Sequence, residues 1–234
     1  MNTKNTLTAL ALAGAMTLGA TAVQAQSPLP TDRTWFNYEY YAEIAVGGPI
    51  DNDYDVVVNV VNPAVYDPDG GFAIAGALGA YVLPNVRAEV ALNYATGGDG
   101  TLTGFGPHAG DIDVFTVLFN GYYEFDEYGF AGDADLTLTP WVGAGLGFQT
   151  FDYDNLGLIN GMFTISDSDT VFAGALHAGV DIAITPTVDL VGRYSLAFVE
   201  SHDVVGNNGT PVAVDSTVEN VFFGGLRLKL NPTR

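Results

Sequence analysis

Residues 171–198 read VFAGALHAGVDIAITPTVDLVGRYSLAF, two alternating segments that are separated by the tripeptide at 185–187. Apolar residues recur at every second position along both segments, which is the period of a β-strand and not of an α-helix. The opposite face of the two segments holds ionisable side chains: His177, Asp181, Asp189 and Arg193. Each segment is longer than the about 5 to 6 residues of a usual soluble strand and reaches the about 9 to 11 that cross a bilayer. The stretch therefore predicts a transmembrane β-hairpin.

The amino-terminal residues have the pattern of a secretory signal. Lys4 precedes an apolar core from Leu7 to Leu18, and Val23-Gln24-Ala25 resembles a small-residue cleavage site. We therefore expect residues 1–25 to be a signal peptide and the mature chain to leave the cytoplasm. The apolar core is too short to span a membrane, and no other stretch offers about 18 uninterrupted apolar residues, which argues against a helical membrane protein.

The composition narrows the class of protein further. The chain of 234 residues has a formal net charge of −20, so it is not expected to bind nucleic acid. It has no cysteine, so an exported fold needs a closed hydrogen-bonded structure or a large core in place of disulfides. Only 15% of its residues are charged, which argues against a disordered acidic tail. Its 29 glycines fit tightly bent strands.

Eight segments in all show the strand period, after a polar lead-in over residues 26–34. The predicted strands are residues 35–47, 72–83, 86–95, 113–125, 136–150, 171–184, 188–198 and 217–230. The connections alternate between long and short, as in outer-membrane barrels with long external loops and short periplasmic turns. The sequence therefore predicts an all-β fold over residues 35–231, an eight-stranded antiparallel up-and-down transmembrane β-barrel with both termini in the periplasm. Closure would satisfy every backbone polar group in lipid.

Several short motifs in the second half of the chain support this prediction: Asn120-Gly121-Tyr122-Tyr123-Glu124-Phe125, residues 138–148, Ala178-Gly179-Val180-Asp181 with Thr185-Pro186, and Gly192-Arg193-Tyr194. Through them the chain resembles the small eight-stranded outer-membrane β-barrel family of Gram-negative bacteria, the porin-family surface antigens related to the OmpA barrel. The resemblance implies an outer-membrane location, contact with outer-membrane lipid and lipopolysaccharide, and assembly by periplasmic chaperones and the barrel-insertion machinery. Gly225 to Leu230 resembles the carboxyl-terminal assembly signal, with Leu230 in the place of the family's usual aromatic residue.

The strand parity predicts a set of ionisable side chains that face the lumen. The candidates for lumen ion pairs or a gate are Glu43, Arg87, Glu89, Glu124, Asp181, Asp189, Arg193, Glu219, Arg227 and Lys229. The interior of an eight-stranded barrel is only wide enough for side chains to fill it, so these groups are expected to form a plug of ion pairs. The alternative is a gate in which Arg and Glu groups exchange partners and let ions pass.

A catalytic arrangement is a third, weaker hypothesis. His177, Asp181 and Ser195 share lumen parity on neighbouring strands, which suggests an acyl-transfer triad as in barrel lipases. No nucleophile motif surrounds Ser195, and His177 faces a filled interior, so the preferred interpretation is a polar core contact. The sequence therefore predicts a non-enzymatic protein with an envelope-structural or surface-interaction role. The alternatives are a narrow porin-like channel for ions or small solutes and, third, a barrel lipid hydrolase.

No cofactor or metal site is predicted. Asp51, Asp53 and Asp55 begin like a calcium loop, but Val56 and Asn62 occupy the positions that require Gly and Glu. The acidic loops are expected to be solvated. A weaker hypothesis is that their carboxylates share Ca²⁺ or Mg²⁺ with lipopolysaccharide phosphates, for which the candidates are Asp67, Asp69, Asp152, Asp154, Asp167 and Asp169.

Aromatic residues near the predicted strand ends are expected to anchor the barrel at the two membrane interfaces. They are Trp35, Tyr38, Tyr40, Tyr94, Tyr122, Tyr123, Tyr128 and Phe148. The histidines outside the strands, His108 and His202, are predicted to be surface loop residues. The middle of the first long connection, residues 56–61, is the one part of the loops that is predicted to prolong a hairpin beyond the membrane.

Overall fold

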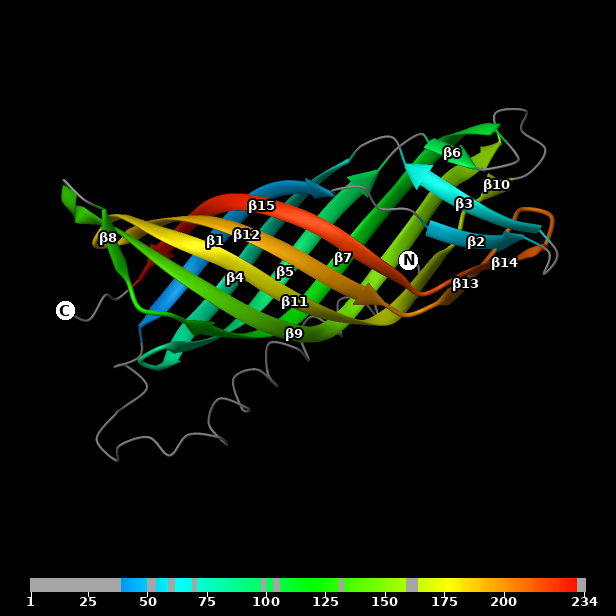
Figure 1. Cartoon of the computed structure of the whole chain (residues 1–234). Coiled ribbons are helices and arrows are strands. Elements are labelled where there is room, and N and C mark those ends of the chain that lie inside the picture. The colour runs from blue at the N-terminus through cyan, green and yellow to red at the C-terminus, as the bar shows by residue number, and fades with distance from the viewer. Residues whose placement is uncertain are drawn as a thin grey trace.

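The computed structural model describes residues 39–49, 54–58, 62–68, 71–97, 100–102, 106–130, 133–158 and 164–230. The regular structure of these residues is antiparallel β-sheet throughout, and eight long strands close into a barrel (Figure 1). Among these residues, no helix long and apolar enough to cross a membrane is found. The predicted signal peptide and lead-in, residues 1–34, lie outside the described residues.

Each barrel strand pairs with the next one along the chain. The eight are β1 (Tyr40–Pro49), β4 (Phe72–Leu83), β5 (Val86–Gly97), β7 (Gly106–Glu124), β9 (Asp133–Leu158), β11 (Ser168–Thr185), β12 (Val188–Val199) and β15 (Thr217–Lys229). The barrel closes where β1 pairs with β15, from Tyr41 opposite Lys229 to Pro49 opposite Val221. Closure leaves no free strand edge in this part of the sheet, so the predicted fold class is confirmed.

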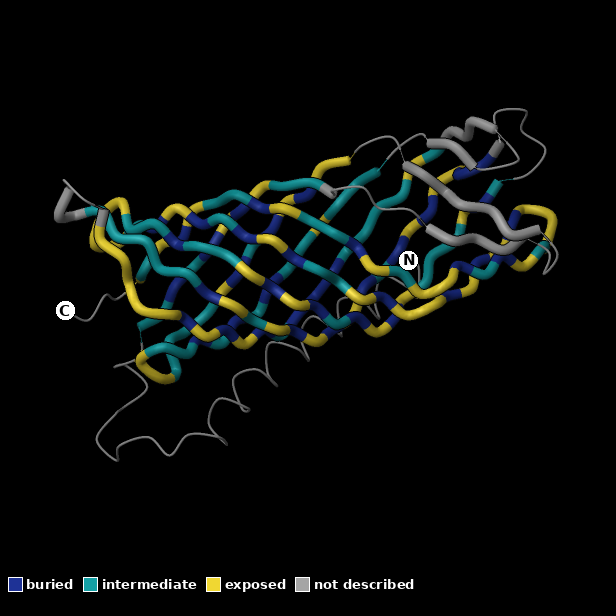
Figure 2. The backbone as a smooth tube through the Cα atoms, in the orientation of Figure 1, coloured by how far each residue is buried: buried dark blue, intermediate teal, exposed yellow. Residues whose placement is uncertain are grey.

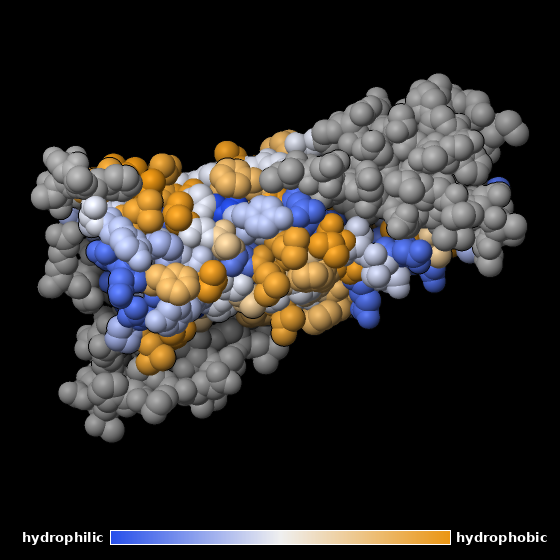
Figure 3. Space-filling view, viewed as in Figure 1, coloured by the Kyte–Doolittle hydropathy of each residue, from blue (hydrophilic) through white to orange (hydrophobic). Residues whose placement is uncertain are grey.

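Burial alternates along the barrel strands with a period of two (Figure 2). In β12, Leu190 and Tyr194 are exposed on the outer wall, whereas Asp189 and Arg193 are only 3% exposed and face inward. The outer wall carries large apolar side chains, which gather along the barrel in Figure 3. The barrel is therefore turned inside out relative to a soluble protein, with its apolar face outside and its polar groups inside, as a lipid-facing barrel requires.

The two ends of the barrel differ. At one end, which we call the turn end, the tight turns Pro84-Asn85 and Pro186-Thr187 connect neighbouring strands. The first strand begins and the last strand ends there, since Tyr41 lies opposite Lys229. A short strand, β8 (Tyr128–Phe130), also lies at this end and pairs with β9.

At the opposite end, the ring end, the sheet continues beyond the barrel as an external ring. Six short strands form it with the far ends of β7 and β9: β2 (Tyr54–Val58), β3 (Asn62–Pro68), β6 (Gly100–Leu102), β10 (Thr164–Ile165), β13 (His202–Val205) and β14 (Pro211–Val214). They pair in the order β7, β6, β3, β2, β14, β13. One bridge, between Ile165 of β10 and Gly206, the residue that follows β13, closes the ring.

The external ring corrects the prediction of irregular loops over residues 96–112, 151–169 and 199–216. β9 runs on to Leu158 and β7 begins at Gly106, so both continue well past the predicted strand limits. The predicted extension at residues 56–61 corresponds to the β2–β3 hairpin. The strands were missed because each is short, and because pairing between segments distant in sequence is what orders them.

The inside of the external ring is apolar where the barrel lumen is charged. Phe151, Tyr153 and Leu156 from β9 pack there against buried residues of the neighbouring segments: Ile165, Val171, Val199, Val204 and Val212. This cluster provides the ring with a hydrophobic core of its own, which short strands need in order to be stable.

The single bridge that closes the ring predicts a disulfide site. Asn207 N donates to Thr164 O at 2.8 Å, so Ile165 and Gly206 form a non-hydrogen-bonded pair with Cα atoms about 4.5 Å apart. That spacing lies within the about 4.4 to 6.8 Å of disulfides. The double variant Ile165→Cys/Gly206→Cys should therefore cross-link on mild oxidation.

The chain has no other cysteine, so a gel shift that is reversed by reductant reports this cross-link alone. The two single-cysteine variants are the controls. Free thiols persisting in the double variant under oxidation would contradict closure of the ring at this bridge.

Candidate functional site

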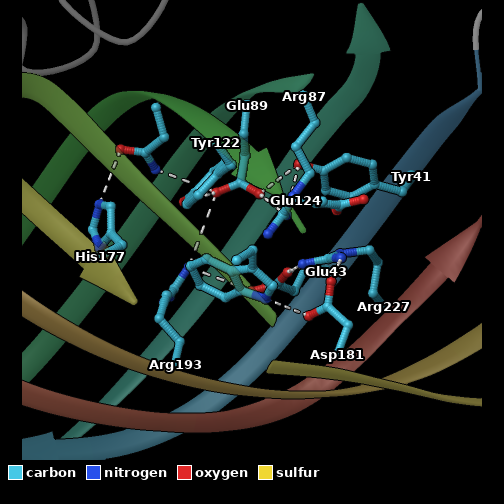
Figure 4. Close-up of polar contacts among 12 residues, drawn as sticks. Tyr41, Glu43, Arg87, Glu89, Tyr122, Glu124, His177, Asp181, Arg193 and Arg227 are labelled. Atoms are coloured by element: carbon cyan, nitrogen blue, oxygen red, sulfur yellow. Dashed lines mark hydrogen bonds and ion pairs between the residues drawn. The ribbon is translucent and has the colours of Figure 1, made fainter. Parts of the chain in front are cut away.

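The inward positions of the barrel hold the polar side chains that the sequence analysis selected. All ten predicted lumen residues lie on inward positions of six barrel strands: Glu43, Arg87, Glu89, Glu124, Asp181, Asp189, Arg193, Glu219, Arg227 and Lys229. All except Lys229 are buried, and Lys229 lies half-buried at the turn end. Figure 4 shows most of them pointing toward one another across the lumen.

Glu43 forms hydrogen bonds with two of the three arginines that lie in the lumen. Its Oε2 accepts hydrogen bonds from Arg227 Nε at 3.2 Å and Nη2 at 2.9 Å, and its Oε1 accepts one from Arg193 Nη1 at 3.4 Å. Arg227 Nη1 also donates to Asp181 Oδ2. Because Arg227 is fully buried, these two carboxylates neutralise a cation that no bulk water reaches.

The third arginine lies in a second cluster around Glu89. Arg87 Nε is 3.0 Å from Glu124 Oε1, and its Nη1 is 3.7 Å from Glu89 Oε2. Glu89 accepts hydrogen bonds from Tyr41 at 2.8 Å, Tyr122 at 2.9 Å and Asn120 at 3.3 Å. The two clusters touch, since Arg193 Nη1 lies 4.0 Å from Glu89 Oε1.

Aromatic rings fill the space beside the guanidinium groups. The Arg87 guanidinium carbon lies 4.1 Å from the centroid of Tyr122 and 4.8 Å from that of Trp141. The Arg227 guanidinium carbon lies 4.8 Å from the centroid of the Tyr41 ring. Such cation–π contacts hold a cation where little water is available, so the interior combines ion pairs with aromatic packing.

Tyr122 corrects the prediction of an interface anchor. Its side chain is buried in the lumen and packs edge-on against Trp141, with ring centroids 5.1 Å apart. The parity of β7 explains this, because Tyr122 shares the inward face with Asn120 and Glu124. Tyr123, the next residue, is exposed on the outer wall as predicted.

Glycines make room for these large inward side chains, a feature that the sequence analysis did not identify. Tyr41 lies directly opposite Gly79 on the neighbouring strand, and Tyr122 lies directly opposite Gly143. A Cβ atom on Gly79 would lie 2.2 Å from the Tyr41 ring, and one on Gly143 would lie 2.2 Å from the Tyr122 ring. Each aromatic ring therefore lies flat across the neighbouring strand, at a position where that strand has no side chain.

The remaining predicted residues lie at the two ends of the lumen. Near the turn end, Lys229 Nζ is 3.1 Å from Asp189 Oδ1, beside a cavity of about 50 Å³ that also borders Tyr81 and Glu124. Such a cavity holds at most a few water molecules. Toward the ring end, Glu219 accepts hydrogen bonds from Gln149 Nε2 at 3.1 and 3.2 Å.

The three residues of the hypothetical triad are not brought together. His177 Nδ1 is 2.9 Å from Ser195 Oγ, and its Nε2 is 3.3 Å from Asn120 Oδ1. Asp181 instead accepts a hydrogen bond from Trp141 Nε1 at 2.8 Å and pairs with Arg227. The predicted grouping of His177, Asp181 and Ser195 is therefore wrong, because Asn120 and not Asp181 contacts the second imidazole nitrogen. In the described part of the chain, no group of three or more His, Asp or Glu side chains is arranged to hold a metal ion.

His202 lies in the external ring and corrects the prediction of a surface loop residue. Its ring stacks on Phe151, with centroids 4.5 Å apart and an interplanar angle of 13°. Its Nε2 is 2.7 Å from the Tyr153 hydroxyl. Burial lowers the pKa of His202 below its ordinary value of 6.5, although Asp169, the Glu200 backbone and Asp203 oppose this shift.

The opposition of Tyr41 and Gly79 predicts a strong effect of a single methyl group. Gly79→Ala should lower the free energy of unfolding by about 1 to 3 kcal/mol, because the added Cβ overlaps a buried ring. Gly76→Ala on the same strand is the control, since no atom lies within 4 Å of its Cβ position and the change should be nearly neutral. Urea unfolding of the refolded barrels measures both. Equal stability of the two variants would contradict the packing described for Tyr41.

The buried imidazole predicts that the external ring loosens in acid. Because the pKa of His202 is lower in the folded ring than in the unfolded chain, neutral His202 stabilises the ring above pH 6.5. This stability is lost as the pH falls through the lowered pKa. The protection factors of the Val204 and Val212 amides, corrected for the intrinsic pH dependence of hydrogen exchange, should therefore fall on acidification. His202→Phe keeps the stacked ring but cannot titrate, so its exchange should lose this component, and an unchanged acid response would contradict the assignment.

No protein-family model matches this sequence, and no curated protein matches it. Several solved structures are similar. Neisserial surface protein A is 17% identical, with a TM-score of 0.50, and the match covers 82% of this chain and 97% of that one. OprG from Pseudomonas aeruginosa is 15% identical over 83% of this chain and 95% of that one, with a TM-score of 0.58. The outer membrane protein AlkL is 16% identical over 89% of this chain and 99% of that one, with a TM-score of 0.52. This chain therefore has the fold of the small eight-stranded outer-membrane β-barrels.

Proposed function

We propose that this protein is a non-enzymatic outer-membrane barrel with a sealed lumen, which acts through its external ring in envelope structure or surface interaction. The observation that carries the proposal is the state of the three lumen arginines. Each is paired with carboxylates and packed against an aromatic ring, and none is more than 3% exposed. A continuous water path would have to pass these side chains.

The geometry of the barrel supports the same proposal. An interior of eight strands is just wide enough for side chains to fill. Here the rings of Tyr41, Tyr122 and Trp141 occupy the width that the opposing glycines leave free. The lumen is then a structural core, and the surface available for interaction lies at the ends.

The orientation and the partners are also part of the proposal. The turn end carries the short connections, so we assign it to the periplasm, with both termini, and the ring end to the cell exterior. The apolar outer wall would contact outer-membrane lipid. The external ring, with its acidic side chains, would lie at the depth of lipopolysaccharide. Periplasmic chaperones and the barrel-insertion machinery would be partners during assembly.

A narrow channel is the second candidate, and one contact favours it. Arg193 Nη1 lies 3.4 Å from Glu43 and 4.0 Å from Glu89, so a second carboxylate is within reach if the first pair opens. Exchange of Arg193 between these two partners would need only a small movement of its side chain. Conductance distinguishes this gate from a permanent plug.

The sealed lumen predicts that the refolded protein shows no steady openings in a planar bilayer. Arg193→Ala removes one partner of a buried pair and should cost about 3 to 5 kcal/mol of stability. Gly76→Ala on the outer wall is the control, since no atom lies within 4 Å of its Cβ position and the change should be nearly neutral. Reproducible openings of the unaltered protein would overturn the plug and establish the channel.

A further inference from the structure

The cavity of about 50 Å³ at the turn end of the lumen is lined mainly by ionisable and polar side chains. Its ionisable lining residues are Tyr81, Glu124, Glu127, Asp181, Asp189 and Lys229. Thr137, Thr139 and Ala183 complete its wall. Glu127 is exposed and Lys229 is half-buried, so the cavity reaches the surface of the protein at this end.

The carboxyl groups at this cavity outnumber the cations that pair with them. Arg87 pairs with Glu124, Arg227 pairs with Asp181, and Lys229 pairs with Asp189. The fourth carboxyl group belongs to Glu127, and among the ion pairs between described residues none involves it. The cavity therefore has one more carboxyl group than it has cations, and it attracts a further positive charge.

Asp189 provides a buried acceptor that is still without a hydrogen bond. The residue is 3% exposed, and its Oδ1 has no hydrogen-bond partner among the described residues. Lys229 Nζ is 3.1 Å from this oxygen, but the contact does not have the geometry of a hydrogen bond. Since a buried acceptor without a donor is unfavourable, the cavity favours an occupant that brings N–H groups as well as charge.

The chemistry of this wall matches that around the three lumen arginines. Each of those guanidinium groups lies between carboxylates and an aromatic ring, and here Asp189 and Glu127 lie at the same cavity as the ring of Tyr81. A guanidinium group has five N–H donors in a planar fork and stacks on aromatic faces, so it suits such a site. A metal ion suits it less, because no metal-binding group of acidic or His side chains is found in the described part of the chain.

The sequence has an arginine within reach of the cavity. Arg33 precedes Glu39 by six residues and lies outside the described residues. Glu39 lies beside the cavity wall, since Tyr81 N donates to Glu39 O at 2.9 Å. Six extended residues span up to about 20 Å, so the chain before Glu39 is long enough to return to the cavity.

The surroundings of Glu39 favour Arg33 over Arg234, the other cation that flanks the barrel. Burial raises the pKa of Glu39, Lys229 opposes this shift and Asp189 adds to it, so Glu39 lies in the field of the ion pair at the cavity. Leu230, the last described residue before Arg234, is instead exposed on the outer wall.

We propose that the turn-end cavity binds the guanidinium group of Arg33, so that the segment before the first strand docks on the barrel at this end. The guanidinium donates to Asp189 Oδ1 and lies between Glu127 and the ring of Tyr81. The inference rests on the proposed sealed lumen and deepens it, because the docked segment balances the charge that the lumen cations leave at this end.

The test is the rate at which a single thiol in the cavity wall reacts with methyl methanethiosulfonate, a small uncharged reagent. The chain has no cysteine, so Thr137→Cys provides the only thiol. Arg33→Gln in this background should accelerate labelling about fivefold or more, as expected for loss of an ion pair with a cation–π contact. Loss of a nearby cation by itself lowers the thiolate fraction and slows the reaction, so faster labelling reports an emptied cavity.

Arg234→Gln is the matched control, since it removes the same charge from the other flanking segment and should leave the rate unchanged. Ala183→Cys, directly opposite Thr137 on β11, provides a second thiol position if the first variant does not fold. Heat-dependent gel mobility shows which variants are folded barrels. Conductance of the unaltered protein tests the sealed lumen separately, since steady openings would overturn it whatever the labelling rates.

Equal labelling rates with and without Arg33 would overturn the docking. Acceleration by Arg234→Gln alone would assign the cavity to the other segment and overturn the choice of Arg33. Equal acceleration by both substitutions would reduce the effect to net charge and overturn a specific site.

Discussion

The rest of the structure depends on one constraint, that the lumen of an eight-stranded barrel must be filled without leaving a buried charge unpaired. Between residues 34 and 226 the sequence has only two Lys or Arg residues, Arg87 and Arg193, and both lie in the lumen. Arg227 joins them there. The chain thus uses its few cations to neutralise inward carboxylates, and none of the described residues of the external ring is cationic.

The same constraint explains why aromatic rings in the lumen lie opposite glycines. Guanidinium groups in a narrow interior need flat partners, and Tyr41, Tyr122 and Trp141 provide them. A flat ring crosses the neighbouring strand, so that strand carries Gly79, Gly143 or Gly179 at the opposing position. A guanidinium group, an aromatic ring and a glycine therefore pack as one unit, in which a substitution at any of the three disturbs the other two.

The strand period alone was sufficient to predict the barrel and its inward charged residues, because parity depends only on local sequence. It was not sufficient to predict contacts that depend on register between distant strands. The opposition of Tyr41 and Gly79, the partners of Asp181, and the closure of the external ring at Ile165 and Gly206 are of this kind. His202 was misassigned for the same reason, since its stacking partner Phe151 lies about 50 residues away in sequence.

The chemistry of the interior changes along the barrel axis. The interior is charged within the barrel and apolar within the external ring, where Phe151, Tyr153 and Val204 pack together. A barrel needs no ordered ring to cross a bilayer, and long connections in such proteins are ordinarily loops. This chain instead orders its long connections into strands with a core of their own. The lumen side chains are paired with one another, so a role in surface interaction, as we propose it, falls to the ordered surface of the external ring.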